Sequence, residues 1–510
     1  ADVGAEQELG RLKLDYSARH TQTAIHLGHS PEGGVLINRL SNVGWILDRT
    51  QSDLFPRFTQ TEGADITNPA NYRPAPNGLA NSMQDTDQYV DELRADVRST
   101  LPGSIPAYVK TGLVWQNQLV QIRTRNRRWS YTGTTALPSD PSIPMFDQVK
   151  TGRNIPQWDA TPLMNNRAPV DSTLWREDVY FREQANSIGS QRVTEKVTAG
   201  YVMAQGRWGQ MGLLAGVRTE KTETEGAGWV RGRAATTAAQ QAADPVGSAR
   251  RDYADNRRET SGTYTKSFPS VHLTQNLTPN LRGRLSWSTS FGRPALSNVV
   301  PSETVNEPNQ TLTVNNPALL PQTAANWDAT LDYYFEPVGN LSVGWFHKTI
   351  KDYIVGGVIS GTVATGTDNG FNGEYGGLTL LHSSNAGTAI VQGWEFSYQQ
   401  QFTFLPGPLK GLSALVNFSV IDTHGDFGGT ANLTTGQVAG FIPRTGNLSV
   451  SWRHRGFSTR VLVNYTSTFI TAYSAANVGR NLYRFPRTAV SVGFSYQVRP
   501  SLVFSCDVSN

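Results

Sequence analysis

Residues 281–354 alternate in polarity from one position to the next, and no other feature of the sequence limits its fold as strongly. Between positions 281 and 291 the odd residues are apolar, small or hydroxylated, namely Leu281, Gly283, Leu285, Trp287, Thr289 and Phe291. The even residues are arginine or serine. Segments 326–335 and 341–350 repeat the alternation, although Phe346 and Ile350 blur the second of them. Because strand side chains alternate between faces, each segment is predicted to be a strand with one apolar and one polar face.

Strand length and connection length indicate what kind of sheet this is. A soluble sheet also alternates, with its apolar face inward, so alternation alone does not identify the face that meets water. Strands of about ten residues, joined alternately by tight turns and long loops and ending in aromatic residues, are typical of outer-membrane barrels. The sequence therefore predicts an all-β protein, a transmembrane antiparallel β-barrel in which we count about sixteen strands.

Composition agrees with one β-domain spanning residues 1–510. Apolar residues make up 38% of the chain, and no run approaches the roughly 18 apolar residues that a membrane-spanning helix needs. The 45 basic and 41 acidic residues are spread along the chain, which argues against a nucleic-acid partner. Cys506 is the only cysteine, so the chain forms no internal disulfide.

Connections between the expected strands fall into two classes. The tight ones lie at residues 277–280, 336–340, 405–410, 454–456 and 498–500. The long ones lie near residues 134–192, 224–261, 293–323, 355–387, 423–443 and 469–486. Within the first long loop, residues 174–187 are predicted to form a short helix, capped by 171–173. Long loops should gather at one end of the barrel because the two classes alternate.

Parity assigns side chains to the two faces of the predicted barrel. Five aromatic residues are expected to face lipid: Trp287, Trp327, Trp345, Trp394 and Trp452. Six polar residues are expected to face the lumen: Arg282, Arg284, Asp328, Asp332, Lys348 and Glu395. Carboxylates and cations on the same face are expected to pair across strands.

Sequence signatures of catalysis are missing. We find no Gly-x-Ser-x-Gly elbow, no phosphate-binding loop and no dinucleotide fingerprint. No histidine pair is accompanied by Cys or Glu at zinc-site spacing. The sequence therefore predicts no catalytic residues, no metal ligands and no cofactor, and the protein is not expected to be an enzyme.

Several motifs follow one another in an order that resembles the barrel of a TonB-dependent receptor, an active transporter of the Gram-negative outer membrane. The first is Phe291-Gly-Arg-Pro294, and Asn315-Asn-Pro-Ala-Leu-Leu-Pro321 comes after it. Trp345-Phe-His-Lys-Thr-Ile-Lys-Asp-Tyr-Ile354 and Gly393-Trp-Glu395 follow. Single motifs of this kind are weak, but their order over about residues 200–510 resembles this family specifically.

The resemblance implies a function and a set of partners. Such a receptor resides in outer-membrane lipid and takes up a scarce solute, with energy supplied through TonB, ExbB and ExbD. Relative to the family, the plug domain and the last strand are not visible, so we expect an incomplete barrel of about sixteen of twenty-two strands. The sheet should then be open, with Leu9–Arg19 and Ser501–Ser509 as its edges.

Two other interpretations remain. A passive porin of about sixteen strands matches the strand count, although its loops would be unusually long. An enzyme built on a barrel or on a soluble β-rich fold is the third, and the missing nucleophile and base argue against it. The substrate stays open between siderophores, cobalamin, oligosaccharides and peptides.

The long loops are the expected site of selectivity, because binding residues concentrate on loops carried by a rigid scaffold. In the loop 355–387, Phe371 and Tyr375 stand among the carboxylates Asp368 and Glu374. Aromatic faces beside polar groups suit a sugar or an aromatic chelator. These four residues are the predicted ligand contacts, and packing of the loop on the barrel rim is the alternative role.

Overall fold

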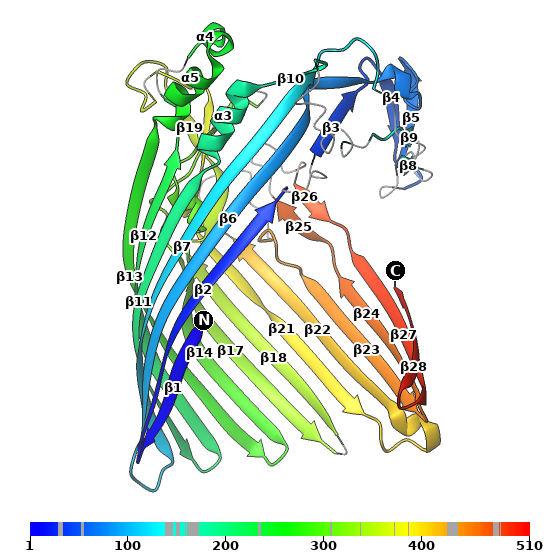
Figure 1. The fold of residues 1–510 in the computed structure, drawn as a ribbon. Helices are drawn as coiled ribbons and strands as arrows, with labels where there is room; N and C mark the ends of the chain where they lie inside the picture. The colour runs from blue at the N-terminus through cyan, green and yellow to red at the C-terminus, as the bar shows by residue number, and fades with distance from the viewer. Residues whose placement is uncertain are drawn as a thin grey trace.

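In the computed structural model, one antiparallel sheet of eighteen strands curves into an open trough (Figure 1). The structure describes residues 1–509 except 29–33, 53–55, 138–145, 149–152, 159, 161–172, 233–235, 307–308, 337, 372, 386, 426–436, 473–478 and 480. Sixteen strands of the sheet have eight residues or more, and two short strands extend it. The predicted all-β antiparallel class and the expected strand number are confirmed.

The sixteen long strands pair in chain order with their neighbours. They are β1 (Asp2–Leu9), β2 (Leu12–Leu27), β6 (Arg73–Thr100), β7 (Ala107–Tyr131), β11 (Gln191–Trp208), β12 (Met211–Trp229), β13 (Arg257–Thr278), β14 (Leu281–Gly292), β17 (Gln322–Phe335), β18 (Gly339–Lys351), β21 (Thr388–Gln401), β22 (Leu412–Gly425), β23 (Arg444–His454), β24 (Phe457–Thr466), β27 (Arg487–Arg499) and β28 (Leu502–Ser509). The short strand β3 (Gly34–Arg39) pairs with the first part of β6, and the short strand β10 (Trp175–Glu177) pairs with the last residues of β7.

The sheet has two open edges in the described part of the chain. There, β28 pairs only with β27, as expected for the segment 501–509. At the other edge β1 pairs only with β2, so the prediction of a single edge strand over Leu9–Arg19 is wrong. The chain reverses at Gly10, whose φ of +63° suits glycine, and the predicted strand is divided between two neighbours of a hairpin.

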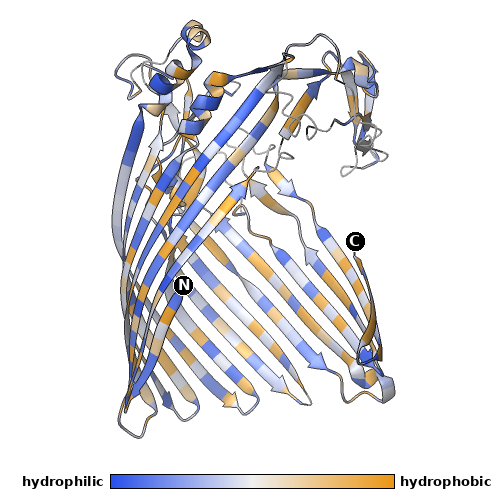
Figure 2. Cartoon of the chain, in the orientation of Figure 1, coloured by the Kyte–Doolittle hydropathy of each residue, from blue (hydrophilic) through white to orange (hydrophobic). Residues whose placement is uncertain are grey.

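The register between neighbouring strands keeps mainly apolar side chains on one face of the sheet and mainly polar side chains on the other. Trp287 lies opposite Trp327, and Trp345 lies opposite Trp394. The sheet's apolar face continues through Leu448 and Val463 to Val490. Orange and blue alternate along these strands in Figure 2, as the sequence predicts. We call the face that carries the tryptophans the outer face and the opposite, concave face the inner face.

The aromatic residues of the outer face lie at two levels. The rings of Trp287 and Trp327 are tilted at 48° with 6.4 Å between centroids, in the strand halves that lead toward the long loops. Trp452 lies at the other end, beside the tight turn after β23, and donates its indole N–H to the Pro408 carbonyl at 2.9 Å. Outer-membrane barrels carry aromatic belts at both membrane interfaces, and contact of the five outer-face tryptophans with lipid stays a prediction.

The long connections gather at the upper end of the molecule in Figure 1, and the tight turns at the lower end. They carry three small antiparallel pairs, β4 (Gly44–Asp48) with β5 (Arg57–Glu62), β8 (Phe146–Gln148) with β9 (Arg153–Ile155), and β25 (Phe469–Ala472) with β26 (Leu482–Arg484). A four-stranded sheet contains β15 (Glu303–Asn306), β16 (Thr311–Val314), β20 (Thr379–Asn385) and β19 (Ile354–Thr362).

The helical segments of the described chain are short. They are η2 (Pro69–Asn71), α3 (Val179–Ile188), α4 (Ala238–Ala243), α5 (Pro245–Ala249), η3 (Arg250–Ala254), α6 (Leu296–Val299) and η4 (Gly407–Gly411). The helix expected over 174–187 begins later, because Trp175–Glu177 pairs with β7 and Asp178 provides the N-cap. None of the described helices is long and apolar enough to span a membrane.

Candidate functional site: the inner wall and the loops above it

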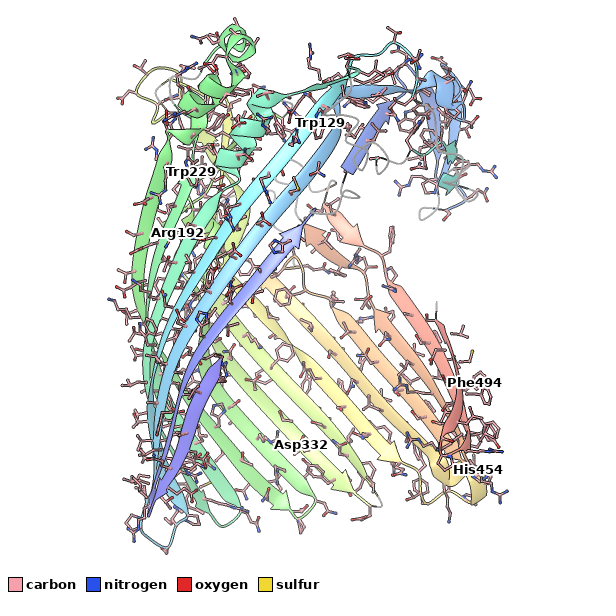
Figure 3. All side chains as sticks on the ribbon, viewed as in Figure 1. Trp129, Arg192, Trp229, Asp332, His454 and Phe494 are labelled. Carbon is pink, nitrogen blue, oxygen red and sulfur yellow. The ribbon has the colours of Figure 1, made fainter. Side chains whose placement is uncertain are left out.

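The structure brings the six predicted lumenal residues onto the inner face. Arg282 lies opposite Asp332, and Glu395 lies opposite Gly344. Strand alternation places the rest of the set on the same face: Arg284, Asp328 and Lys348. Asp332 marks this concave wall in Figure 3. Four neighbouring strands, β14, β17, β18 and β21, therefore bring these charges together.

The charged side chains around Asp332 form ion pairs or hydrogen bonds with neighbouring side chains. Asp332 is 6% exposed, and its carboxylate forms an ion pair with Arg284 at 2.9 Å. The Ser342 hydroxyl donates a hydrogen bond to the same carboxylate at 2.8 Å. Arg282 donates from Nε to the side-chain oxygen of Asn276 at 2.9 Å. These contacts join neighbouring strands on the inner face, although the Asp332 Oδ2 atom, which faces Arg284, is buried without a hydrogen bond among the described residues.

The other three charges are less constrained. In the described chain Asp328, Lys348 and Glu395 form no ion pair, contrary to the expected pairing across strands. The Lys348 ammonium lies 5.6 Å from the centroid of the Phe346 ring. These groups leave both signs of charge accessible on the inner wall.

A second charged cluster lies where β14 ends, and it centres on Arg293. The Arg293 guanidinium binds Glu220 at 2.7 Å and lies 3.8 Å from Glu195. Arg218 approaches Glu220 from the other side at 2.7 Å. Since Arg293 begins the segment that leads to α6, this cluster fixes the base of that loop against the inner face of β11 and β12.

Burial decides the electrostatics of this cluster. Glu195 is 7% exposed and lies beyond the apolar band of β11, where burial raises the pKa of its carboxyl. Arg293 acts in the opposite direction and Glu220 in the same one. Sequence reasoning named Arg293 and Glu220 only as parts of separate motifs, and it did not predict that either lies beside Glu195. The available signal was a carboxylate on the parity of Val193 and Val197, which are both buried.

The loop after Arg293 packs closely on the inner wall. Val300 is fully buried, and Thr260 on β13 donates its hydroxyl to the Val299 carbonyl. A side chain at Gly226 would approach the Val299 backbone to 2.7 Å, so this contact requires glycine on β12. The segment therefore narrows the upper end of the lumen.

Two long loops share one sheet. β16 pairs in parallel with β20, which joins the loop after β14 to the loop after β18. Asn385 adds two hydrogen bonds of 2.8 Å with the backbone of Leu320. A small hydrophobic core of Leu312, Val363 and Leu378 lies within this sheet region. The two loops are therefore one packed unit above the lumen.

The predicted ligand contacts occupy different positions in this unit. Phe371 and Tyr375 pack against its core, with ring centroids 5.5 Å apart. Burial raises the pKa of Tyr375 to about 12, and its hydroxyl lies 3.4 Å from the Glu303 carboxylate. Glu374 is half-buried, whereas Asp368 is exposed. The two rings thus stabilise the loop, and Asp368 is the most accessible of the four.

The family of the chain is decided by a comparison with protein-family models. The model described as "TonB dependent receptor-like, beta-barrel" matches residues 28–510. The chain belongs to the TonB-dependent receptor family. It carries the barrel portion, and receptors of this family are proteins of the Gram-negative outer membrane.

Solved structures show the same fold at low sequence identity. The ferric-catecholate import receptor Fiu from E. coli K12 has a TM-score of 0.60 and 13% identity, covering 98% of this chain and 57% of that one. The siderophore receptor PiuA from Acinetobacter baumannii has a TM-score of 0.54 and 11% identity, covering 99% of this chain and 59% of that one. The ferric yersiniabactin uptake receptor FyuA from Yersinia pestis has a TM-score of 0.52 and 12% identity, covering 100% of this chain and 55% of that one. No curated protein sequence matches the chain.

These comparisons account for the two faces and leave the activity to be tested. The chain spans little more than half the length of the receptor structures it matches. Among the described residues, no group of three or more His, Cys, Asp or Glu is arranged to hold a metal ion. The inner wall offers charged and hydrogen-bonding side chains, among them Arg284, Asp332 and Lys348.

Proposed function

We propose that this chain forms the barrel wall of a receptor that imports a scarce solute across the outer membrane. TonB, acting with ExbB and ExbD, supplies the energy, and outer-membrane lipid surrounds the outer face. The family match over residues 28–510 carries the proposal. Import leaves the solute chemically unchanged, so the reaction needs no nucleophile or base.

The geometry supports two separate roles along the barrel axis, capture of the solute by the loops and its passage along the inner wall. The joined loops after β14 and β18 form an ordered surface at the upper end, where a solute arrives first. Below them, the inner wall carries polar side chains from β14 to β23. Ordered loops lower the entropy cost of capture, and a polar wall replaces part of the solute's hydration on the way through.

The first substrate class to test is a chelated metal. The similar structures include a ferric-catecholate import receptor and a ferric yersiniabactin uptake receptor. Their identity to this chain is 12–13%, so they support the fold and only suggest the cargo. Cobalamin and oligosaccharides belong in the same panel.

Uptake by the complete protein tests the proposal. We would express it in a Gram-negative strain that lacks its own siderophore receptors and measure accumulation of radiolabelled ferric siderophores, cobalamin and maltodextrins. Accumulation of one of these, abolished in a matched strain without TonB, is the expected result. Flux that persists without TonB would instead identify a passive porin, and no accumulation of any panel member would contradict this cargo range.

Asp368 offers a sharper test of the loop surface. Asp368→Asn removes an exposed charge at the tip of the joined loops. If Asp368 binds the imported solute through a charge-assisted hydrogen bond, the Kd should rise about tenfold, or ~1.5 kcal/mol. Asp255→Asn is the matched control, because Asp255 is an exposed loop carboxylate elsewhere. Equal Kd values for all three proteins would exclude Asp368 from the contact.

A further inference from the structure

Four long loops meet at the upper end of the molecule. They follow β7, β12, β14 and β18, and the last two already share the sheet that contains β16 and β20. The helix α3 belongs to the loop after β7, and it packs against α5 and η3, which belong to the loop after β12. α3 and α5 lie at the upper left of Figure 1. We call these four loops together the four-loop cap.

Asp252 joins the loop after β12 to the loop after β7. It is fully buried, and the Tyr180 hydroxyl of α3 donates a hydrogen bond to its carboxylate at 2.7 Å. Thr236 donates two more, from its backbone N–H at 2.8 Å and from its hydroxyl at 2.6 Å. The Gln184 amide of α3 donates to the hydroxyl of the neighbouring Tyr253 at 3.0 Å. Because a buried carboxylate without donors is costly, these contacts hold α3 and η3 together.

The two tyrosines of this junction remain protonated at neutral pH. Burial raises the pKa of the Tyr180 hydroxyl, and the hydrogen bond to Asp252 raises it further. Burial also raises the pKa of Tyr253. The two rings meet edge to face with 6.4 Å between centroids, a favourable arrangement for aromatic pairs. The junction therefore combines hydrogen bonds with ring packing and stays intact around neutral pH.

Arg231 joins the loop after β12 to the loop after β18. Its guanidinium is half-buried and lies close enough to Glu374, Tyr375 and Tyr253 for electrostatic interaction with all three. The Tyr375 hydroxyl in turn lies 3.4 Å from the Glu303 carboxylate, in the loop after β14. The Tyr375 ring packs on the hydrophobic core beside β16 and β20. Contacts therefore run without a break from α3 to the sheet that contains β20.

We infer that the four-loop cap is one cooperative unit, joined through Asp252 and Arg231, which opens as a whole rather than loop by loop. Its contacts are buried and continuous, and segments connected in this way open together. Separating the loops at either junction leaves buried polar groups without partners, which is costly. A ligand that binds to one of the four loops therefore stabilises the other three as well. The inference goes beyond the proposed import function and does not depend on it.

Hydrogen exchange measured far from each substitution tests the cooperative unit. In the complete protein in detergent micelles, Tyr180→Phe removes the hydroxyl at the α3 end of the contacts, and exchange is measured in β20. Tyr375→Phe removes the hydroxyl at the other end, and exchange is measured in α3. Tyr72→Phe is the matched control, because Tyr72 is a buried tyrosine outside the four-loop cap whose hydroxyl donates to the Ile66 carbonyl at 2.7 Å.

The expected result is a reciprocal loss of protection. Removing one buried hydroxyl should speed amide exchange of both α3 and β20 about fivefold in either variant, because all amides of one unit open together. Tyr72→Phe should leave exchange in both segments unchanged. Asp252→Ala removes the acceptor of both Tyr180 and Thr236, so exchange in the two segments should become about fiftyfold faster. Exchange of the barrel strand β23 should keep the wild-type rate in every variant.

Two results would overturn the cooperative unit. Faster exchange confined to α3 in Tyr180→Phe, and to β20 in Tyr375→Phe, would show that each junction acts only on its own loop. Unchanged exchange of α3 and β20 in all the variants would show that the junctions do not hold the loops. If Asp252→Ala also disturbs β23, the two Tyr→Phe variants decide, since they keep their rings. Import is measured separately, so neither result by itself rejects the proposed function.

Discussion

The long strands near the amino end and the short strands near the carboxyl end belong to one sheet but differ in length and in what they carry. β6 and β7 have 28 and 25 residues, whereas β23 and β24 have 11 and 10. The short strands extend from one turn to the next across the apolar band. The long strands continue far beyond it and carry the large loops (Figure 1). One sheet thus combines the apolar band with a support for the large loops.

Beyond the apolar band, the outer face of the long strands becomes polar and their inner face becomes apolar. Outer-face polar contacts occur there, such as the hydrogen bond between His20 and Asp91 and the ion pair of Arg123 with Asp87, each at 2.7 Å. On the inner face of β11, Val197 and Ala199 become buried. The outer face carries charged and polar side chains in this region, and the inner face carries buried apolar ones. Surroundings, rather than strand geometry, therefore determine which parity is apolar.

The largest expected effect breaks this comparison on the outer face. Leu285→Arg places a cation within the apolar band of β14, where lipid surrounds it, and should cost about 2–4 kcal/mol of folding free energy. Thr194→Arg is the matched change on the outer face of β11 beyond the band, beside Glu225, and should cost about 0–1 kcal/mol. Urea titration of the complete protein in lipid vesicles measures both, and equal losses would show that the band is misplaced.

This contrast also explains how much could be predicted from the sequence. Alternation identified both faces of β14, β17 and β21 because in each of these strands one parity is mainly apolar, the other is mainly polar, and register keeps the two apart. In β11 the apolar residues Val197 and Ala199 share a parity with Tyr201, and all three lie on the inner face. Val197 and Ala199 are buried on that face, and alternation within one strand carries no record of the segments that cover them.

Contacts between distant segments were beyond sequence reasoning for a similar reason. Tyr201 reaches over Gly112 and donates its hydroxyl to Asp96 at 2.5 Å, across the intervening strand β7. A side chain at Gly112 would lie 2.1 Å from the Asp96 carboxylate. Register fixes that arrangement, and register depends on the pattern of both paired strands and on the turn that joins them. The joined loops and the Glu195 cluster depend on long-range contacts in the same way.

The second prediction concerns the anchor between the two regions. Arg293→Ala leaves Glu195 and Glu220 buried without their main cation, so the loop should detach from the wall at a cost of about 2 kcal/mol, allowing for the partial exposure of Arg293. Protease cleavage within residues 294–321 should become faster while the barrel itself still resists heat in detergent gels.

Arg257→Ala is the control for that change. Arg257 pairs with Glu259 on the outer face, and both side chains are exposed, so its loss should cost less than about 1 kcal/mol. Unchanged protease sensitivity in Arg293→Ala would show that the hydrophobic contacts of Val299 and Val300 hold the loop without the ion pair.

The smallest predicted effect separates the two glutamates of the anchor by their pH dependence. Burial raises the pKa of Glu195, so between the ordinary carboxyl pKa and that raised value the folded protein binds more protons than the unfolded chain. Stability must then fall as pH rises through this window. Glu195→Gln removes the buried charge, so it should flatten this slope and change stability at pH 7 by less than about 1 kcal/mol. Glu220→Gln instead weakens ion pairs to both Arg218 and Arg293 and should destabilise the loop at pH 7. Urea midpoints measured from pH 5 to pH 8 compare the two variants, and an unchanged slope in Glu195→Gln would show that another group titrates.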